Sequence, residues 1–239
     1  MENQTAPPRV EKNDDPDYPI WLLGDSPSVN YPDLTPLDPT HPSRHTIWTP
    51  ILDVIQRHLF LERGQRLDDS KLFIRNAVSD YRHKLEKPKT LGAEIAKFQD
   101  KQVEEIKELR ELLNRPNKPR PLLVLCFGEF AYACALRTQQ EVKEILRPQD
   151  WNKWGIRGLS REFKVRIDDV QLGRVTLLPL LHASVALSFQ DASRNFSGGG
   201  GNYFEYVGRE IADKLILHSQ HPRLTELWLP AKREGTASE

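Results

Sequence analysis

The chain has 239 residues, including 34 Lys or Arg and 34 Asp or Glu, so its formal net charge at pH 7 is zero. This length suits one α/β domain that buries its core without disulfides or metal. The balanced charge excludes the strongly basic composition typical of many nucleic-acid-binding proteins, although it permits a basic face. The two cysteines, Cys126 and Cys134, are too few for a four-cysteine metal or iron–sulfur site, and we expect buried thiols.

No apolar stretch is long enough to span a bilayer, and the N-terminus has prolines and acids where a signal peptide would be basic and then apolar. We therefore expect a cytoplasmic protein without a membrane partner. The composition predicts a flexible N-terminal arm over residues 1–18 and a C-terminal tail over 230–239. The remaining residues, 19–229, are expected to form a single α/β domain.

Four short apolar runs predict four buried strands, at residues 20–23, 72–74, 122–125 and 175–181. Continuous apolar runs separated by helical stretches are typical of parallel strands buried on both faces. The predicted fold class is α/β, with three layers α/β/α around a central four-stranded, mainly parallel sheet. Ligands in such sheets bind outside the carboxyl ends of the strands, so the polar residues that follow each run are the candidate site.

Apolar residues spaced three or four apart predict a crossover helix over 93–113 and further helices over 51–61, 130–137 and 203–217. We interpret residues 139–173 as packed irregular structure, within which 163–167 alternate like an edge strand. The proline-rich stretch 31–50 predicts an irregular loop, and the glycine run 198–201 a flexible hinge.

The polar residues that follow the apolar runs could have catalytic or binding roles, or purely structural ones. Asp25, in a Gly-Asp-Ser-Pro turn, could polarise a water molecule, but these residues also suit an ordinary turn. Asn76 presents a donor and an acceptor that could pair with a base edge, although an Asn at a strand end is commonly a cap. His182 stands where a catalyst would lie, beside Ser184, whose hydroxyl could contact a phosphate; a hydrogen-bonded core histidine is the alternative.

Taken together and in this order, these segments resemble the uracil-DNA glycosylase superfamily over residues 18–218. The segments are Gly-Asp-Ser-Pro at 24–27, Asn76 at the end of the second run, Phe-Gly-Glu-Phe-Ala at 127–131 and His-Ala-Ser at 182–184. The chain departs from the family pattern at Ser26, where the most active branches often have Asp or Asn, and at Ala183, where Pro is usual. Cluster cysteines found in some branches are absent.

The resemblance implies a divergent, metal-independent DNA-repair glycosylase without a cofactor, a monomer that extrudes uracil or a related deaminated base from DNA and hydrolyses its N-glycosidic bond. It implies that Asp25 or the adjacent backbone positions the attacking water and that His182 stabilises the departing uracil anion. The implied base-binding residues are Ser26, Asn76, Tyr31 and Trp48. The implied DNA-binding residues are Ser184, Leu187 and Phe189, on a loop over 184–189 that would press into the duplex, together with Arg194.

Two other functions remain open. A protein of this fold could bind nucleic acid or a protein partner without cleaving, which Ser26 and the neutral total charge favour. The Gly-Asp-Ser segment also resembles GDSL-type esterases, in which Ser26 would be the nucleophile, but His182 would then need an acid partner. A basic groove across the strand ends would support either nucleic-acid function, and its candidate residues are Arg44, Arg75, Arg82 and Arg194.

Overall fold

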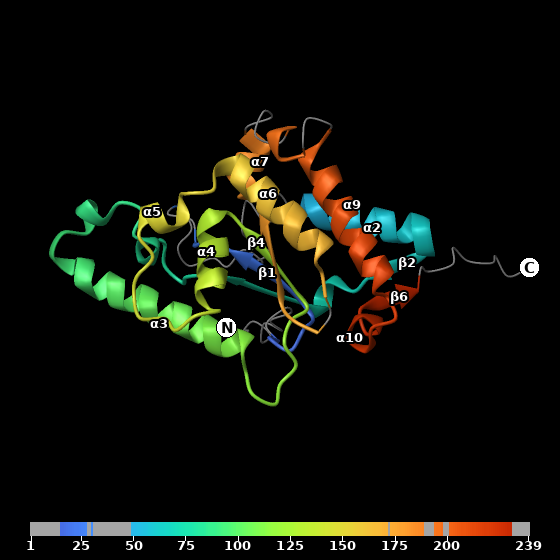
Figure 1. Cartoon of the computed structure of the whole chain (residues 1–239), viewed down its shortest axis with the longest axis horizontal. Helices are drawn as coiled ribbons and strands as arrows, with labels where there is room; N and C mark the ends of the chain where they lie inside the picture. Colours follow the sequence, from blue (N-terminus) through green and yellow to red (C-terminus); the bar gives the residue numbers. More distant parts are fainter. Residues whose placement is uncertain are drawn as a thin grey trace, which may run out of the picture.

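The computed structural model describes residues 15–27, 30, 49–171, 173–188, 194–197 and 201–230. Its central sheet has four strands, all parallel, in the order β3-β1-β4-β5 (Figure 1). The strands are β1 (Ile20–Gly24), β3 (Leu72–Asn76), β4 (Leu123–Phe127) and β5 (Thr176–Leu180). Each of the four apolar runs therefore forms a strand, and the predicted α/β fold class is confirmed.

Helices flank this sheet on both faces. The four predicted helices are present as α2 (Thr49–Arg63), α3 (Ile95–Leu113), α4 (Glu129–Arg137) and α9 (Tyr203–Leu217). The described chain also forms helices that the sequence pattern did not indicate: η1 (Asp69–Lys71), η2 (Tyr81–Lys84), η3 (Pro88–Glu94), α5 (Pro148–Trp151), α6 (Gly155–Asp168), α7 (Ala183–Ser188) and α10 (Pro222–Thr225).

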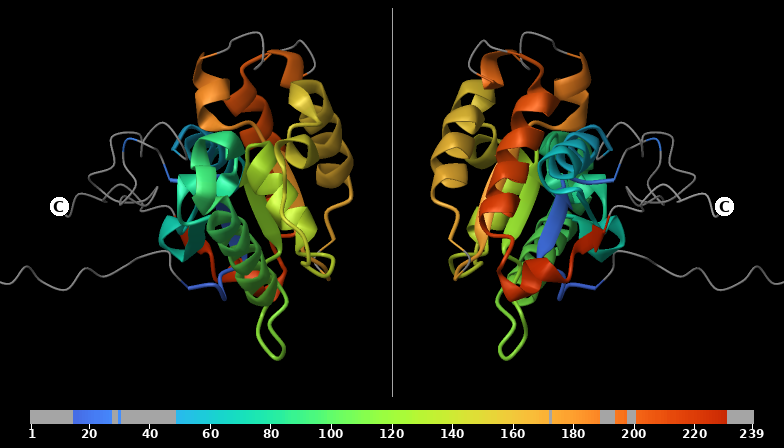
Figure 2. Two further views of the ribbon diagram at one scale, coloured as in Figure 1. Left: turned by 90° about the vertical axis from the view of Figure 1, so that its left-hand side faces the viewer. Right: turned by 90° about the vertical axis from the view of Figure 1, so that its right-hand side faces the viewer.

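The order of the strands determines which face each helix covers. The chain steps from β1 to β3 in one direction and then through β4 to β5 in the other. Because parallel crossovers are right-handed, α2 covers one face while α3, α4 and α6 cover the opposite one. α9 packs against α2, and both α4 and α6 pack against β5 (Figure 2). The result is a three-layer α/β/α fold with core on both sides of the sheet.

The expectation of an edge strand at residues 163–167 is wrong, because these residues belong to α6. Leu159, Phe163 and Ile167 are buried at four-residue intervals, while Lys164 and Val165 are exposed. A five-residue window fits both a period of two and one of 3.6, so alternation alone did not distinguish strand from helix. The four-residue spacing of the buried side chains from Leu159 to Ile167 indicates a helix.

A second, two-stranded sheet pairs β2 (Gln65–Leu67) with β6 (Trp228–Pro230) in antiparallel register. It connects the end of α2 to the segment that follows α10, and it includes Pro230, the first residue of the predicted tail. Within the predicted loop 31–50, residues 31–48 lie outside the described residues, and Thr49 and Pro50 begin α2. No helix in the described part of the chain is long and apolar enough to cross a membrane.

Candidate site at the carboxyl edge of the sheet

The carboxyl ends of β1 and β4 lie side by side, in register from Ile20 opposite Leu123 to Leu23 opposite Cys126. The connections that follow these two strands leave in opposite directions, toward β3 and β5 respectively. In open α/β sheets, ligands bind in the crevice that such a reversal creates. Asp25 follows β1 and Gly128 follows β4, so two of the predicted segments meet at this switch point.

Gly128 lies between Asp25 and His182. Its φ is +103°, a conformation that side chains disfavour, and its N–H donates to the Leu180 carbonyl at the end of β5 at 2.9 Å. A Cβ atom on Gly128 would lie 3.3 Å from the His182 Cβ and 3.8 Å from the Asp25 Oδ2. The tight glycine turn thus allows side chains from the ends of β1 and β5 to approach each other.

Asp25 is a buried carboxylate whose two oxygens have different surroundings. Oδ2 accepts a hydrogen bond from the Lys84 ammonium at 2.8 Å, and the Asp25 and Lys84 side chains are only 9% and 16% exposed. Oδ1 is also buried but has no hydrogen-bond partner in the described structure. An unsatisfied buried acceptor costs about 1–3 kcal/mol or more when charged, so it calls for a functional explanation. Oδ1 is free to accept a hydrogen bond from water or a ligand.

Lys84 is a member of this site that sequence analysis missed. Its Nζ lies 4.8 Å from the centroid of the Trp151 ring and 5.8 Å from that of Phe130, so two aromatic rings contact the same ammonium that pairs with Asp25. Cation–π contacts of this kind stabilise a lysine that is partly removed from water. No motif surrounds Lys84 in the sequence, and only the folded chain brings α5 and η2 together.

A buried glutamine fixes the position of η2 and therefore of Lys84. The Gln102 Nε2 donates to the carbonyls of His83 at 2.9 Å and Leu146 at 3.1 Å, and its Oε1 accepts from the Leu146 N–H at 2.6 Å. The His83 Nδ1 also lies 2.9 Å from the Glu105 Oε2. Both contacts attach η2 to α3, so the ammonium of Lys84 is held at the end of β1.

The hydrogen bonds of His182 define its tautomer. The Ser184 backbone N–H donates to Nδ1 at 3.3 Å, and the Ser184 hydroxyl lies 2.7 Å from the same nitrogen. Because a backbone N–H only donates, Nδ1 has no proton in the neutral ring, and the proton is on Nε2. Partial burial lowers the pKa of His182 below its ordinary 6.5, while Asp25 opposes this shift. At neutral pH His182 is therefore an uncharged donor through Nε2.

Asn76 and Ser26 lie on the same edge of the sheet. Asn76 ends β3 directly opposite Gly24 in the β1–β3 register, and its side chain is half-buried. The Arg75 Nε donates to the Asn76 carbonyl at 3.0 Å, which fixes the backbone at this strand end. Ser26 is half-buried, and no hydrogen bond joins it to His182. The described contacts therefore do not pair Ser26 with His182, as an esterase with Ser26 as its nucleophile would require.

The predicted DNA-contacting loop is partly helical. Residues 183–188 form α7, since the N–H groups of Val185 and Ala186 donate to the His182 carbonyl. Leu187 is 47% exposed on this helix, as a residue inserted into DNA would have to be. The Ser184 hydroxyl contacts His182, so in this structure it positions the imidazole. The predicted residues Tyr31, Trp48 and Phe189 lie outside the described residues.

The arginines expected to form a basic groove have differing surroundings. Arg75 pairs with Glu108 at 3.2 Å, and Arg82 pairs with Asp80, so both cations are compensated by neighbouring acids. Arg194 is exposed, and Arg44 lies outside the described residues. Arg75 and Arg82 are therefore poor candidates for free phosphate-binding groups.

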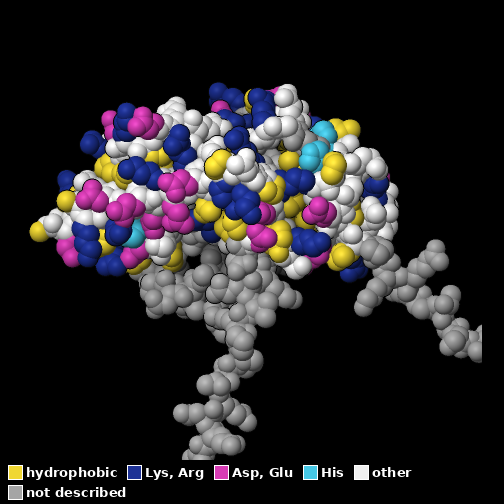
Figure 3. All heavy atoms as spheres, turned by 90° about the horizontal axis from the view of Figure 1, so that it is seen from below, with side chains coloured by type: hydrophobic (Ala, Val, Ile, Leu, Met, Phe, Trp, Pro, Cys, Tyr) yellow, Lys and Arg dark blue, Asp and Glu magenta, His cyan; other side chains and the backbone are white. Residues whose placement is uncertain are grey.

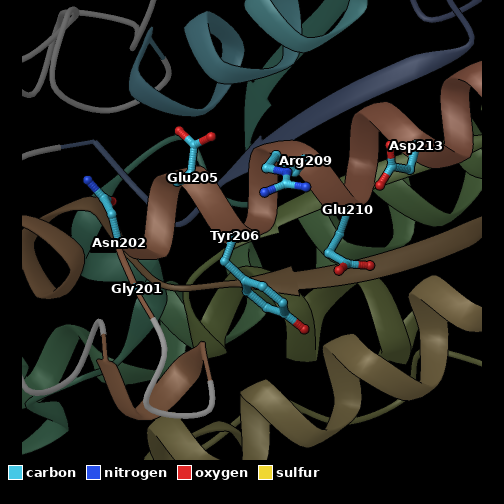
Figure 4. Close-up of a pocket in the computed structure, with 7 residues that line it drawn as sticks. All are labelled: Gly201, Asn202, Glu205, Tyr206, Arg209, Glu210 and Asp213. Carbon is cyan, nitrogen blue, oxygen red and sulfur yellow. The ribbon is translucent and has the colours of Figure 1, made fainter. Parts of the chain in front are cut away.

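A separate hollow of about 250 Å³ runs along α9 (Figure 4). Its lining residues are Gly201, Asn202, Glu205, Tyr206, Arg209, Glu210 and Asp213. Two of its acids already pair with α2, Glu205 with Arg57 and Asp213 with His58. Since most of its charged side chains are acidic, this hollow does not suit an anionic ligand.

The described residues contain no cluster of His, Cys, Asp and Glu that could hold a metal ion. Cys126 and Cys134 are fully buried, and burial raises the pKa of both thiols, so they are neutral core residues as expected. Comparisons with protein-family models and with curated proteins found no match to this chain. Its function is therefore inferred from the site.

Proposed function

We propose that the chain is a DNA-repair glycosylase that hydrolyses the N-glycosidic bond of uracil or a related deaminated base. The observation that supports this proposal best is the arrangement around Gly128, where the buried Asp25 carboxylate has one free oxygen and His182 is an uncharged donor. An acceptor for water and a donor for a departing anion are the two groups that this hydrolysis requires.

In the proposed reaction, Asp25 Oδ1 accepts a hydrogen bond from a water molecule and directs it at C1′ of the extruded nucleotide. The bond from C1′ to N1 of uracil breaks, the water oxygen bonds to C1′, and Asp25 takes the water proton. Uracil leaves as an anion, and the Nε2–H of His182 donates to its O2. Lys84 holds Oδ2 of the carboxylate, so we assign the water molecule to Oδ1, which has no hydrogen-bond partner among the described residues.

Asn76 is the proposed recognition residue for the base. Its amide can donate to O4 of uracil and accept from N3–H, whereas cytosine presents a donor and an acceptor at the same two positions in the reverse order. A site that leaves such groups unpaired discriminates strongly against the wrong base. The position of Asn76 opposite Gly24 places this amide on the same edge of the sheet as Asp25.

The Lys84–Asp25 ion pair favours a second candidate function. The ammonium compensates the charge of the buried carboxylate, so Asp25 also has a structural role that does not depend on catalysis. A protein with this arrangement could bind an extruded base without cleaving it. Catalysis therefore has to be measured directly.

The test incubates the purified chain with labelled oligonucleotides that contain one uracil, hypoxanthine or xanthine, followed by alkali to break strands at abasic sites. We expect breaks with uracil, and a loss of at least about 100-fold in His182→Ala and in Asn76→Ala. His58→Ala and Asn114→Ala remove the same residue types on α2 and at the end of α3, and should keep full activity. No cleavage of any of the three bases would contradict the proposal and favour the non-cleaving protein.

A further inference from the structure

The exposed face of α6 has a row of cations that form no ion pair within the described residues. Arg157, Arg161 and Lys164 recur at four- and three-residue spacing, so they share one helix face, and Lys153 precedes the helix. All four are exposed, and none forms an ion pair with another residue in the described part of the chain. We refer to these four residues as the α6 basic stripe.

The stripe begins next to the candidate site. Glu129, which follows Gly128, accepts hydrogen bonds through Oε1 from the N–H groups of Trp154 at 2.9 Å and Gly155 at 2.6 Å. This contact attaches the start of α6 to the carboxyl edge of the sheet. From there α6 packs along β5 (Figure 1), so the basic stripe extends away from the site along one side of the molecule.

A short segment over residues 194–197 packs beside the stripe. The Ser160 hydroxyl of α6 donates to the Phe196 carbonyl at 2.6 Å, and the rings of Phe196 and Phe163 lie 5.6 Å apart. Arg194, two residues before Phe196, is exposed. The segment thus brings a further cation alongside α6.

Other surface charges of the molecule are mixed in sign. Lys101 pairs with Glu104 on α3, and Arg57 of α2 pairs with Glu205 of α9. On the face seen from below, basic and acidic side chains are interspersed (Figure 3). Like charges four residues apart on a helix are destabilising by a few tenths of a kcal/mol, on the order of 0.2–0.5. The stripe therefore does not stabilise α6. A bound polyanion would neutralise its positive charge and relieve the repulsion.

We propose that the α6 basic stripe binds the phosphate backbone of DNA beside the extruded base, an inference that rests on the proposed function. Arg157 to Lys164 span about 10 Å along the helix at ~1.5 Å per residue. One strand of B-DNA presents about three phosphates over that length, at ~3.4 Å per phosphate. Exposed guanidinium and ammonium groups donate hydrogen bonds to phosphate oxygens. Such contacts position DNA without recognising its sequence.

The test measures binding of a fluorescent, undamaged duplex by anisotropy between 50 and 200 mM KCl. The variant combines Arg157→Gln, Arg161→Gln and Lys164→Gln. The control combines Lys97→Gln, Lys107→Gln and Arg110→Gln, which removes the same charge from exposed positions of α3. Since each phosphate contact contributes about 0.9 to the slope of log affinity against log salt, we expect the stripe variant to reduce that slope by about 2.7 and the control to leave it unchanged.

Equal slopes in the stripe variant and the wild-type chain would overturn the inference, as would a wild-type chain that does not bind DNA. The result is separable from the proposed function. If the wild-type chain releases uracil and the slopes are equal, the stripe inference fails and the glycosylase stands. If the wild-type chain releases no base but its binding depends on the stripe, the glycosylase fails and the stripe inference stands.

Discussion

Asp25 and Lys84 form a buried ion pair in which one carboxylate oxygen accepts from Lys84 and the other, also buried, has no hydrogen-bond partner among the described residues. A carboxylate that served only to neutralise Lys84 would gain from a second hydrogen bond, and the fold provides none from the described residues. Unsatisfied buried groups of this kind are expected where a protein keeps an acceptor ready for a ligand. At the scale of single residues, this oxygen is the strongest indication of function.

We predict that Lys84→Met lowers the free energy of unfolding by about 3 kcal/mol, because it leaves the Asp25 carboxylate buried without a counter-charge. The double variant Lys84→Met with Asp25→Asn removes both charges and should recover most of that loss. Urea denaturation of the wild-type chain, both single variants and the double variant measures the coupling. Additive losses would show that the two groups do not interact.

We predict that His182 is protonated on Nε2 at pH 7 and titrates below pH 6.5, because burial lowers its pKa. The pKa of His182 in the folded chain lies below its value of 6.5 in the unfolded chain, so the unfolded chain binds this proton more readily. His182 therefore lowers the free energy of unfolding as the pH falls from 6.5 toward the folded-state pKa. Heteronuclear NMR of the imidazole nitrogens measures both the tautomer and the pKa of His182, and the His182→Gln variant assigns the signals. A proton on Nδ1, or a midpoint at or above 6.5, would contradict the assignment.

The position of Asp25, Asn76 and His182 on one edge of the sheet could be predicted from the sequence, because parallel strands all end at the same edge. The position of Lys84 could not. It depends on η2 and on three hydrogen bonds of Gln102, which join segments far apart in the chain. A lone lysine in a polar stretch has no periodicity or motif that would indicate such a contact.

At the scale of elements, the β4–α4 junction determines how closely the ends of β1 and β5 approach. Gly128 has a positive φ and also faces His182 and Asp25 at short range. Either property alone would favour glycine. Together they make this junction the element on which the geometry of the site depends most.

We predict that Gly128→Ala lowers stability and also lowers uracil release by about 10-fold, because its Cβ would lie 3.3 Å from the His182 Cβ and shift the imidazole. Gly64→Ala is the control, since Gly64 also has a positive φ, +62°, but has no atom within 4 Å of its added Cβ. Both variants should lose about 1–2 kcal/mol of stability through backbone strain. Full activity in Gly128→Ala would rule out this role for the junction.

α6 is the element that sequence analysis assigned wrongly, and the error also hid a surface feature. Arg157, Arg161 and Lys164 share a face only if the chain is helical, whereas in a strand their side chains would not form one row. The apolar strands, by contrast, were predictable because runs of buried residues bounded by polar ones have few other interpretations. Strands formed by continuous apolar runs could therefore be predicted, whereas α6 and its pattern of exposed charge could not.

At the scale of the whole molecule, a chain with zero formal net charge has the α6 basic stripe beside the site that we propose for an anionic leaving group. Total charge alone does not show where charges are compensated: Glu104, Glu205 and Asp213 pair with neighbouring cations, whereas the α6 basic stripe forms no ion pair within the described residues. The doubly wound sheet places the switch point and the start of α6 on the same edge. DNA bound along α6 would thus pass the crevice between β1 and β4.

The most direct test of the proposed catalysis is the single-turnover rate of uracil release by the wild-type chain and by Asp25→Asn, with DNA affinity measured in parallel. The Asn side chain keeps the shape of Asp25 but cannot accept the water proton. We predict release by the wild-type chain and a loss of at least about 100-fold in the variant, with affinity changed only a few-fold, because a general base contributes ~10²–10⁴ to the rate. No release by the wild-type chain, or equal rates in the two proteins, would contradict the assignment of Asp25 as the catalytic base.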